Sequence, residues 1–132
     1  MINNESEIFT KITTALQDED GSVKTSSVYT NSPSSYPFVS IELISNNVYE
    51  SGVDSGDIEN FAYLGYEIVV MTSGNTRKSK AYSLLEVVDS ELKQLGFTRI
   101  VLAPSQDQNE TLYRLVARYE AVVGKDLKVY RR

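Results

Sequence analysis

Two stretches of the chain repeat apolar residues with the period of an α-helix. Over residues 5–18 the apolar side chains form one stripe at three- and four-residue spacing, and Asn4 with Glu7 has the pattern of a capping box. Over residues 76–95 the stripe is longer, and Gly96 stands where a helix commonly ends. The sequence therefore predicts two amphipathic helices, each with one face turned toward a hydrophobic core.

Other stretches alternate apolar and polar residues, as β-strands do. This pattern predicts strands over residues 38–44, 61–72, 97–102 and 112–123, an extended segment over 23–30 and a short final strand over 127–130. The two longest strands each have one apolar and one mixed face, which is typical of an antiparallel sheet covered by helices on a single side. We therefore expect one α+β domain over residues 1–132. It should contain a mostly antiparallel sheet of four to six strands with two helices packed on one face, in the order α-β-β-β-α-β-β.

Composition excludes several classes of function. With no Cys and no His, the chain has no thiol or imidazole nucleophile, no Ser-His-Asp triad, no zinc finger and no disulfide framework. The net charge of −5 argues against duplex nucleic acid as a partner, because phosphate neutralisation needs clustered Lys and Arg. No apolar run approaches the roughly 20 residues that span a bilayer, and residues 1–5 do not begin a signal peptide. We therefore expect a cytoplasmic protein without a membrane partner.

The charge is divided unevenly along the chain. Residues 1–66 carry ten acids and two bases, a charge of −8, whereas residues 67–132 carry eight acids and eleven bases, a charge of +3. A molecule with one patch of each sign can associate head to tail, which produces closed rings or open filaments. Alternatively, the two halves interleave in the folded protein and the asymmetry disappears from its surface.

Three groups of charged side chains are the candidate contact residues. The first lies in the polar segment 45–60. The second lies at the start of the second helix, where the helix macrodipole disfavours each cation by roughly 0.3–1 kcal/mol. The third lies on the mixed face of the last long strand. The residues are Glu50, Asp54, Asp57, Glu59, Arg77, Lys78, Lys80, Arg114, Arg118 and Glu120. The alternative is that the acidic segment and the basic group are ordinary solvated surface charge.

Enzyme chemistry has little support in the remaining motifs. A paired-carboxylate hydrolase needs two acids across a cleft, one with a raised pKa, whereas most acids here cluster in predicted loops and helix ends. The acidic segment 54–57 departs from EF-hand spacing, and no glycine pattern matches a phosphate-binding loop. Ser79 and Ser83 beside Lys80 lack the motifs of a Ser–Lys nucleophile. We expect no enzyme activity, no catalytic residue, no cofactor and no metal site.

Several segments together resemble a family of phage proteins. They are YPFVSIE at 36–42 with the polar loop after it, YEIVV at 66–70, the helix with KAY at 80–82 that ends in LGF at 95–97, and LYRLVARYE at 112–120. Together they resemble the tail-terminator proteins of long-tailed bacteriophages and prophages, also described as tail-completion, minor capsid or head–tail joining proteins. The resemblance covers most of residues 5–123 and rests on element order, chain length and a closing Tyr-rich strand.

The resemblance implies a small α/β virion protein that assembles as a ring, commonly a hexamer. Such a ring caps the finished tail tube and presents the surface that joins the head. The implied partners are other copies of the chain, the tail tube and head or neck proteins, without recognition of nucleic-acid sequence, and the implied location is the virion, assembled in the cytoplasm of the bacterial host. Arg114, Arg118 and Glu120 would then face a neighbouring subunit or the lumen, and the acidic segment would contact the tube or neck.

Two alternatives to a tail terminator stay open. One is another head–tail connector or neck component of the same virion, since such proteins share this size and composition. The other belongs to a different class: a small stand-alone ligand-binding domain or carboxylate hydrolase. A cleft with two inward carboxylates would favour that class, and an exposed flat sheet face would count against it.

Overall fold

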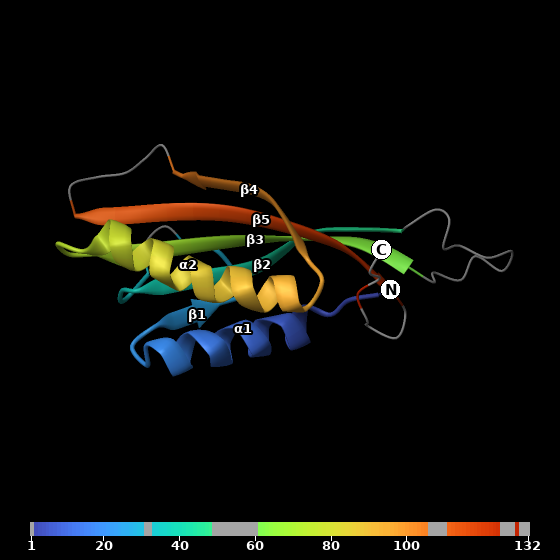
Figure 1. Ribbon diagram of the computed structural model, residues 1–132, viewed down its shortest axis with the longest axis horizontal. Coiled ribbons are helices and arrows are strands. Elements are labelled where there is room, and N and C mark those ends of the chain that lie inside the picture. The colour runs from blue at the N-terminus through green and yellow to red at the C-terminus, as the bar shows by residue number, and fades with distance from the viewer. Residues whose placement is uncertain (1, 31–32, 49–60, 106–110, 125–128, 130–132) are drawn as a thin grey trace, which may run out of the picture.

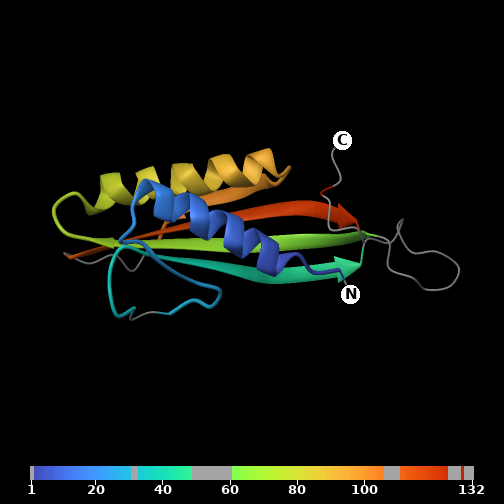
Figure 2. The same ribbon diagram turned by 90° about the horizontal axis from the view of Figure 1, so that it is seen from below.

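The protein folds as a five-stranded sheet with both helices on one face (Figures 1 and 2). This computed structural model describes residues 2–30, 33–48, 61–105, 111–124 and 129. The elements are α1 (Glu5–Glu19), β1 (Lys24–Ser26), β2 (Phe38–Val48), β3 (Phe61–Ser73), α2 (Arg77–Gln94), β4 (Thr98–Pro104) and β5 (Leu112–Gly124). The strand order is β1-β2-β3-β5-β4, and only the β1–β2 pair is parallel. The predicted fold class and element order are therefore confirmed.

The predicted final strand falls mostly outside the described residues. Within them, Val129 forms an isolated antiparallel bridge with Val123. The extended segment predicted over 23–30 is a strand only over the three residues of β1, Lys24–Ser26. The strand β2 is longer than predicted and runs on to Val48, because the register shifts between Leu43 and Ser45 and pairing with β3 then continues. Such a bulge lets a strand extend beyond the point where simple alternation of apolar and polar residues stops.

The helix α1 buries the predicted stripe, with Ile8, Ile12 and Leu16 almost fully shielded from solvent. Its N-cap residue is Asn4, as predicted, but the predicted capping box is wrong because the Asn4 side chain makes no cap hydrogen bond. Instead, Asn4 is buried and its Oδ1 accepts a hydrogen bond of 2.6 Å from the Tyr66 hydroxyl. A hydroxyl in the core needs a polar partner, and this requirement determines where the Asn4 side chain points.

The helix α2 packs on β3 and β5 through one apolar stripe. Its buried residues are Ala81, Leu84, Leu85, Val88 and Leu92. Gly96 follows the helix with φ of 93°, the left-handed conformation that glycine adopts without strain, so the predicted helix end is confirmed.

The sheet has one face in the core and one face turned away from the helices (Figure 2). The buried residues on the helix side of the two central strands are Ala62, Leu64, Tyr66, Ile68, Val70, Leu115, Ala117, Tyr119, Ala121 and Val123. The opposite face, which we call the open face, is covered at one end only. There Tyr29 and Tyr36 pack on a small cluster of Phe38, Val69 and Met71.

The strand order separates the two halves of the chain in space. Figure 1 shows α1 and β1 on one side of the molecule and β4 on the other, with β3 and β5 between them. Among the described residues, the first half holds six acids and two bases, and the second half holds five acids and seven bases. The separation is incomplete, because residues 61–66 of the first half form part of the central strand β3 and Asp20 of the first half pairs with Lys80 of α2. Among the described residues, the charge asymmetry of the sequence therefore reaches the two sheet edges only in part.

Candidate interaction surface

The predicted acidic contact residues cannot be placed. Glu50, Asp54, Asp57 and Glu59 all lie outside the described residues. Their role at an interface therefore stays a prediction from the sequence.

The predicted basic group at the start of α2 is mostly engaged within the chain. Nη1 of Arg77 donates a hydrogen bond of 2.9 Å to the carbonyl oxygen of Gly74, and Nζ of Lys80 lies 2.7 Å from Oδ2 of Asp20. Hydrogen bonds from Lys80 and Ser22 hold the pKa of the Asp20 carboxyl well below its usual range. Lys78 is exposed and makes no ion pair within the described residues, so it is the member of the group best placed for an outside partner.

Arg118 lies in the middle of the open face. It is directly opposite Glu67 in the β3–β5 register, and its Nε lies 2.9 Å from Glu67 Oε2. On the other side of Glu67, in β2, the directly opposed residue is Glu42. Two carboxylates facing each other across strands repel, and the guanidinium of Arg118 offsets this repulsion.

Arg114 lies four residues before Arg118 on the same face of β5. Its guanidinium carbon is 5.9 Å from the centroid of the Tyr29 ring, within the range of a cation–π contact. The two arginines line a pocket of about 240 Å³, together with Tyr29, Glu67, Val69, Ser105 and Val116. With two guanidinium groups and one carboxylate, this pocket suits a small acidic group.

Glu120, the third predicted residue of β5, is half-buried on the same face. Its register partners are Gly65 in β3 and Thr98 in β4. The structure therefore brings Arg114, Arg118 and Glu120 together on the open face, where the sequence predicted a mixed strand face.

The most exposed strand is β4, which forms one edge of the sheet. Every residue of β4 is exposed, and Ile100, Val101 and Leu102 keep 51%, 41% and 37% of their surface in solvent. Because α2 packs mainly on β3 and β5, it leaves β4 largely uncovered, and a register shift between Arg99 and Val101 turns Ile100 outward. Among the described residues, no other strand pairs with the outer edge of β4.

This edge is the feature that sequence reasoning missed. The alternation predicted a strand near these residues but not that it would be exposed. A signal was present, because three consecutive apolar residues at 100–102 cannot all face the same core from a strand. At least one of them has to face solvent or another molecule.

The opposite edge of the sheet, formed by β1 and part of β2, is partly covered by the N-terminal segment. Beyond the three-residue β1, the edge of β2 meets the N-terminal segment. The Leu43 N–H donates to a carboxylate oxygen of Glu5 at 3.3 Å, and Nδ2 of Asn46 donates to the carbonyl oxygen of Ile2 at 2.6 Å. The first bond occupies a backbone N–H of β2 that a partner strand would otherwise use, and the second holds the N-terminal segment against this edge.

A partly buried polar network anchors the start of β4. The Asp89 carboxylate of α2 accepts bonds from the Tyr119 hydroxyl at 2.7 Å and Arg99 Nη1 at 3.2 Å, and Nζ of Lys93 lies at 3.0 Å. Burial alone would raise the pKa of Asp89, but the hydrogen bonds from Tyr119 and Lys93 and the charge of Arg99 outweigh it and lower that pKa. A general acid requires the opposite shift, so this network serves the fold and holds Arg99 in place.

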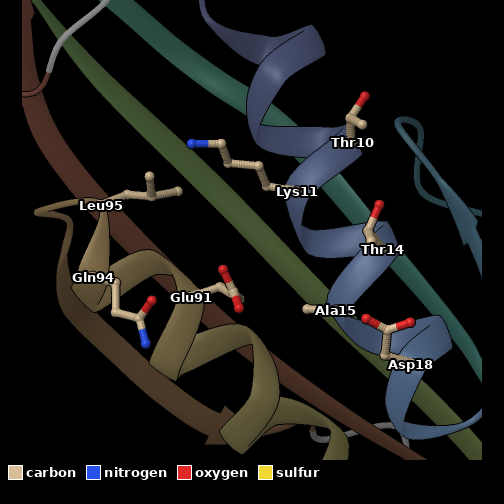
Figure 3. A pocket seen from close by; sticks show the side chains of 8 residues that line it. All are labelled: Thr10, Lys11, Thr14, Ala15, Asp18, Glu91, Gln94 and Leu95. Atoms are coloured by element: carbon tan, nitrogen blue, oxygen red, sulfur yellow. The ribbon is translucent and has the colours of Figure 1, made fainter.

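A groove of about 510 Å³ separates the two helices on the covered side (Figure 3). Its lining residues are Thr10, Lys11, Thr14, Ala15, Asp18, Glu91, Gln94 and Leu95. Figure 3 shows the Lys11 side chain extending from α1 toward α2, and its amine lies 3.4 Å from Glu7. The groove mixes both signs of charge and is open to solvent, so it offers no concentrated recognition of one ligand.

Two kinds of site are not found among the described residues. No group of three or more His, Cys, Asp or Glu among them could hold a metal ion, and none of their helices is long and apolar enough to cross a membrane. The opposed carboxylates of Glu42 and Glu67 lie on an open sheet face and not across a cleft. In comparisons with known proteins, no family model and no curated protein sequence matches this chain.

Proposed function

We propose that the chain is a structural assembly protein of a phage or prophage virion, resembling a tail terminator, which associates into a ring at the end of the tail tube. The observation that carries the assembly role is the edge strand β4, which has three consecutive apolar residues and is exposed along its whole length. Monomeric proteins protect such edges, because an open row of N–H and C=O groups beside apolar side chains pairs readily with another chain. The step from assembly protein to tail terminator rests on the sequence resemblance.

The open face supports the same proposal. It carries Glu67, Arg114, Arg118 and Glu120 on a broad sheet surface, so charged groups are displayed over an area and not gathered around one reacting atom. A ring subunit needs such surfaces to meet its neighbours and the tube. An enzyme would instead need a shielded site in which pKa values are moved toward the working pH.

Removing the gene from the phage or prophage that encodes the chain tests the proposal. The expected result in electron micrographs is tails of abnormal length that do not join heads, with both defects corrected by the wild-type gene. Complementation with Ile100→Lys, which places a charge on the β4 edge, should fail. Ser83→Lys, a change at an exposed position of α2, should succeed. Tails of normal length joined to heads in the deletion would overturn the proposal.

A neck or connector role is the alternative within the same virion. The two roles differ in where the protein is found when heads are absent. A terminator should remain on tails purified from a strain that makes no heads, whereas a connector should be missing from those tails and present on heads from a tail-deficient strain. Immunoblots of the two preparations distinguish them.

The pocket beside Arg114 and Arg118 favours one candidate of a different class, a module that binds a small acidic ligand. Such a ligand should raise the melting temperature of the wild-type protein and not that of Arg114→Gln. A panel of di- and tricarboxylates measured by thermal shift separates this candidate from an assembly protein, which should show no such response.

A further inference from the structure

We infer that the β4 edge of one copy docks on the α1–β1 edge of the next copy, so that the chain associates head to tail and not about a two-fold axis. This inference rests on the proposed function in one respect, since it takes self-association as what the chain does. It adds the partner surface and the direction of assembly.

The terminal strands β1 and β4 each lack a second strand partner among the described residues, and exposed apolar side chains lie at or beside both. At one edge are Ile100, Val101 and Leu102 of β4. At the other, β1 is the terminal strand, and Val28 just beyond it is 61% exposed, the highest value among the large apolar residues of the described chain. Contact between the edges would shield both apolar groups from water at once.

The two edges also differ in charge. The α1, β1 and β2 elements carry five acids against two bases, and Asp18 and Glu19 at the end of α1 are exposed without an ion pair among the described residues. The β4 and β5 elements carry Arg99, Arg114 and Arg118 against the single carboxylate of Glu120. Two of these arginines are also paired with carboxylates of neighbouring elements, Arg99 with Asp89 and Arg118 with Glu67, so the cationic excess near β4 is small. Pairing β4 with β4 would bring two cationic surroundings together, whereas pairing β4 with the acidic edge brings opposite charges together.

The directions of the strands also favour contact between β4 and β1. The strand β1 is parallel to β2, and the β2–β3, β3–β5 and β5–β4 pairs are antiparallel. It follows that β4 and β1 run in opposite directions. A second copy in the same orientation therefore continues the sheet through an antiparallel β4–β1 pair, the arrangement with the more favourable hydrogen-bond geometry.

Head-to-tail contact has a consequence for assembly. A contact between two different surfaces leaves one surface of each kind unused at the ends of a chain of subunits, so addition continues. The product is an open filament if successive copies keep one orientation, and a ring if each copy is rotated by a constant angle that closes. A two-fold contact between identical edges would stop at a dimer. The inferred contact is therefore the kind that a ring requires.

Cysteine cross-linking tests the contact directly, because the chain has no cysteine of its own. Ile100→Cys and Val28→Cys are prepared as separate purified proteins, mixed at high concentration and treated with a short thiol cross-linker. The mixture should give roughly tenfold more cross-linked dimer than either variant alone, which corresponds to a difference in contact free energy of about 1.4 kcal/mol. The double variant should give a ladder of larger species.

A matched control uses Ser83→Cys in place of Val28→Cys, since Ser83 is also exposed but lies on α2. All three positions are on the surface, and thermal melts should confirm that each variant is folded. Dimer from Ile100→Cys alone at the level of the mixture would overturn the inference in favour of two-fold pairing. Cross-linking no greater than with Ser83→Cys would show that the partner of β4 is not this edge of a second copy.

The experiment separates failure of the contact from failure of the proposed function, because it uses purified protein and no phage. Cross-links together with normal tails in the deletion strain would keep the contact and reject the tail role. Tail defects without cross-links would keep the tail role and reject this contact.

Discussion

The two edges of the sheet contrast in length, covering and charge. The β1 edge has a strand of three residues, acidic surroundings and, beyond it, a stretch of β2 whose polar groups are bonded to Glu5 and Ile2. The β4 edge has seven exposed residues, three consecutive apolar side chains and cationic surroundings. A short or covered edge is how proteins prevent unwanted pairing, so the long uncovered β4 is the better candidate for intended pairing, and at the opposite edge only the short β1 remains to receive it.

The largest effect on stability should come from weakening the packing of α1 beside the β1 edge. Ile12 is fully buried, and Ile12→Ala removes core packing beneath the covered edge. We expect the free energy of unfolding to fall by about 2–5 kcal/mol in urea titrations. Thr14→Ala, at an exposed position of the same helix, is the control and should change stability little. Similar losses in both variants would contradict the packing of α1 described above.

The next effect concerns the buried bond between Asn4 and Tyr66. Tyr66→Phe leaves the Asn4 oxygen buried without its donor and should cost about 1–3 kcal/mol of unfolding free energy. Adding Asn4→Leu should restore part of that loss, because both partners are then apolar. Tyr36→Phe is the control, since the Tyr36 hydroxyl has no hydrogen-bond partner within the described chain. An unchanged unfolding free energy in Tyr66→Phe would contradict the conclusion that Asn4 points into the core to bond Tyr66 instead of capping α1.

The network beneath β4 should produce an acid-dependent effect. The pKa of Asp89 is lower in the folded protein than its ordinary value of 3.8, so the folded state binds this proton less tightly than the unfolded state. Its contribution to stability is therefore complete above about pH 4 and is lost as the pH falls through the folded pKa. Asp89→Asn should flatten the acid side of a stability–pH curve, and Tyr119→Phe, which removes one donor, should flatten it less. Curves unchanged in both variants would contradict the network.

The smallest effect should come from the ion pair on the open face. Arg118 and Glu67 are both partly exposed, so their coupling in a double-mutant cycle should be about 0.2–1 kcal/mol and should shrink at high salt. Glu67→Gln should be milder than Arg118→Gln, because it also removes the repulsion with Glu42. A coupling above that range would mean that the pair is part of a shielded site and not of a solvent-facing surface.

The fold could be predicted largely from the sequence, because helices and strands that are buried on one face have apolar residues at regular spacing. The stripes of both helices, the apolar faces of β3 and β5 and the end of α2 at Gly96 all follow from local spacing. The role of Asn4 could not be predicted in this way, since its partner Tyr66 is 62 residues away and only the folded core brings them together.

The candidate surface was predictable only in part. The alternating pattern of β5 identified Arg114, Arg118 and Glu120 as one face, which the structure bears out. It could not reveal that Lys80 pairs with Asp20, because the turn after α1 and the start of α2 become neighbours only through helix packing. The exposure of β4 depends likewise on which strands α2 covers, and this is a property of the tertiary arrangement.

Amide hydrogen exchange as a function of protein concentration tests the central claim most directly, because it reads both edges in one sample. If β4 is the associating edge, its outward amides should exchange more slowly as concentration rises. The amides of β2 near Leu43, whose edge is already bonded within the chain, should not change. Exchange rates of the β4 amides that do not change with protein concentration, up to the highest concentration at which the protein stays soluble, would contradict the claim that this edge binds a second copy.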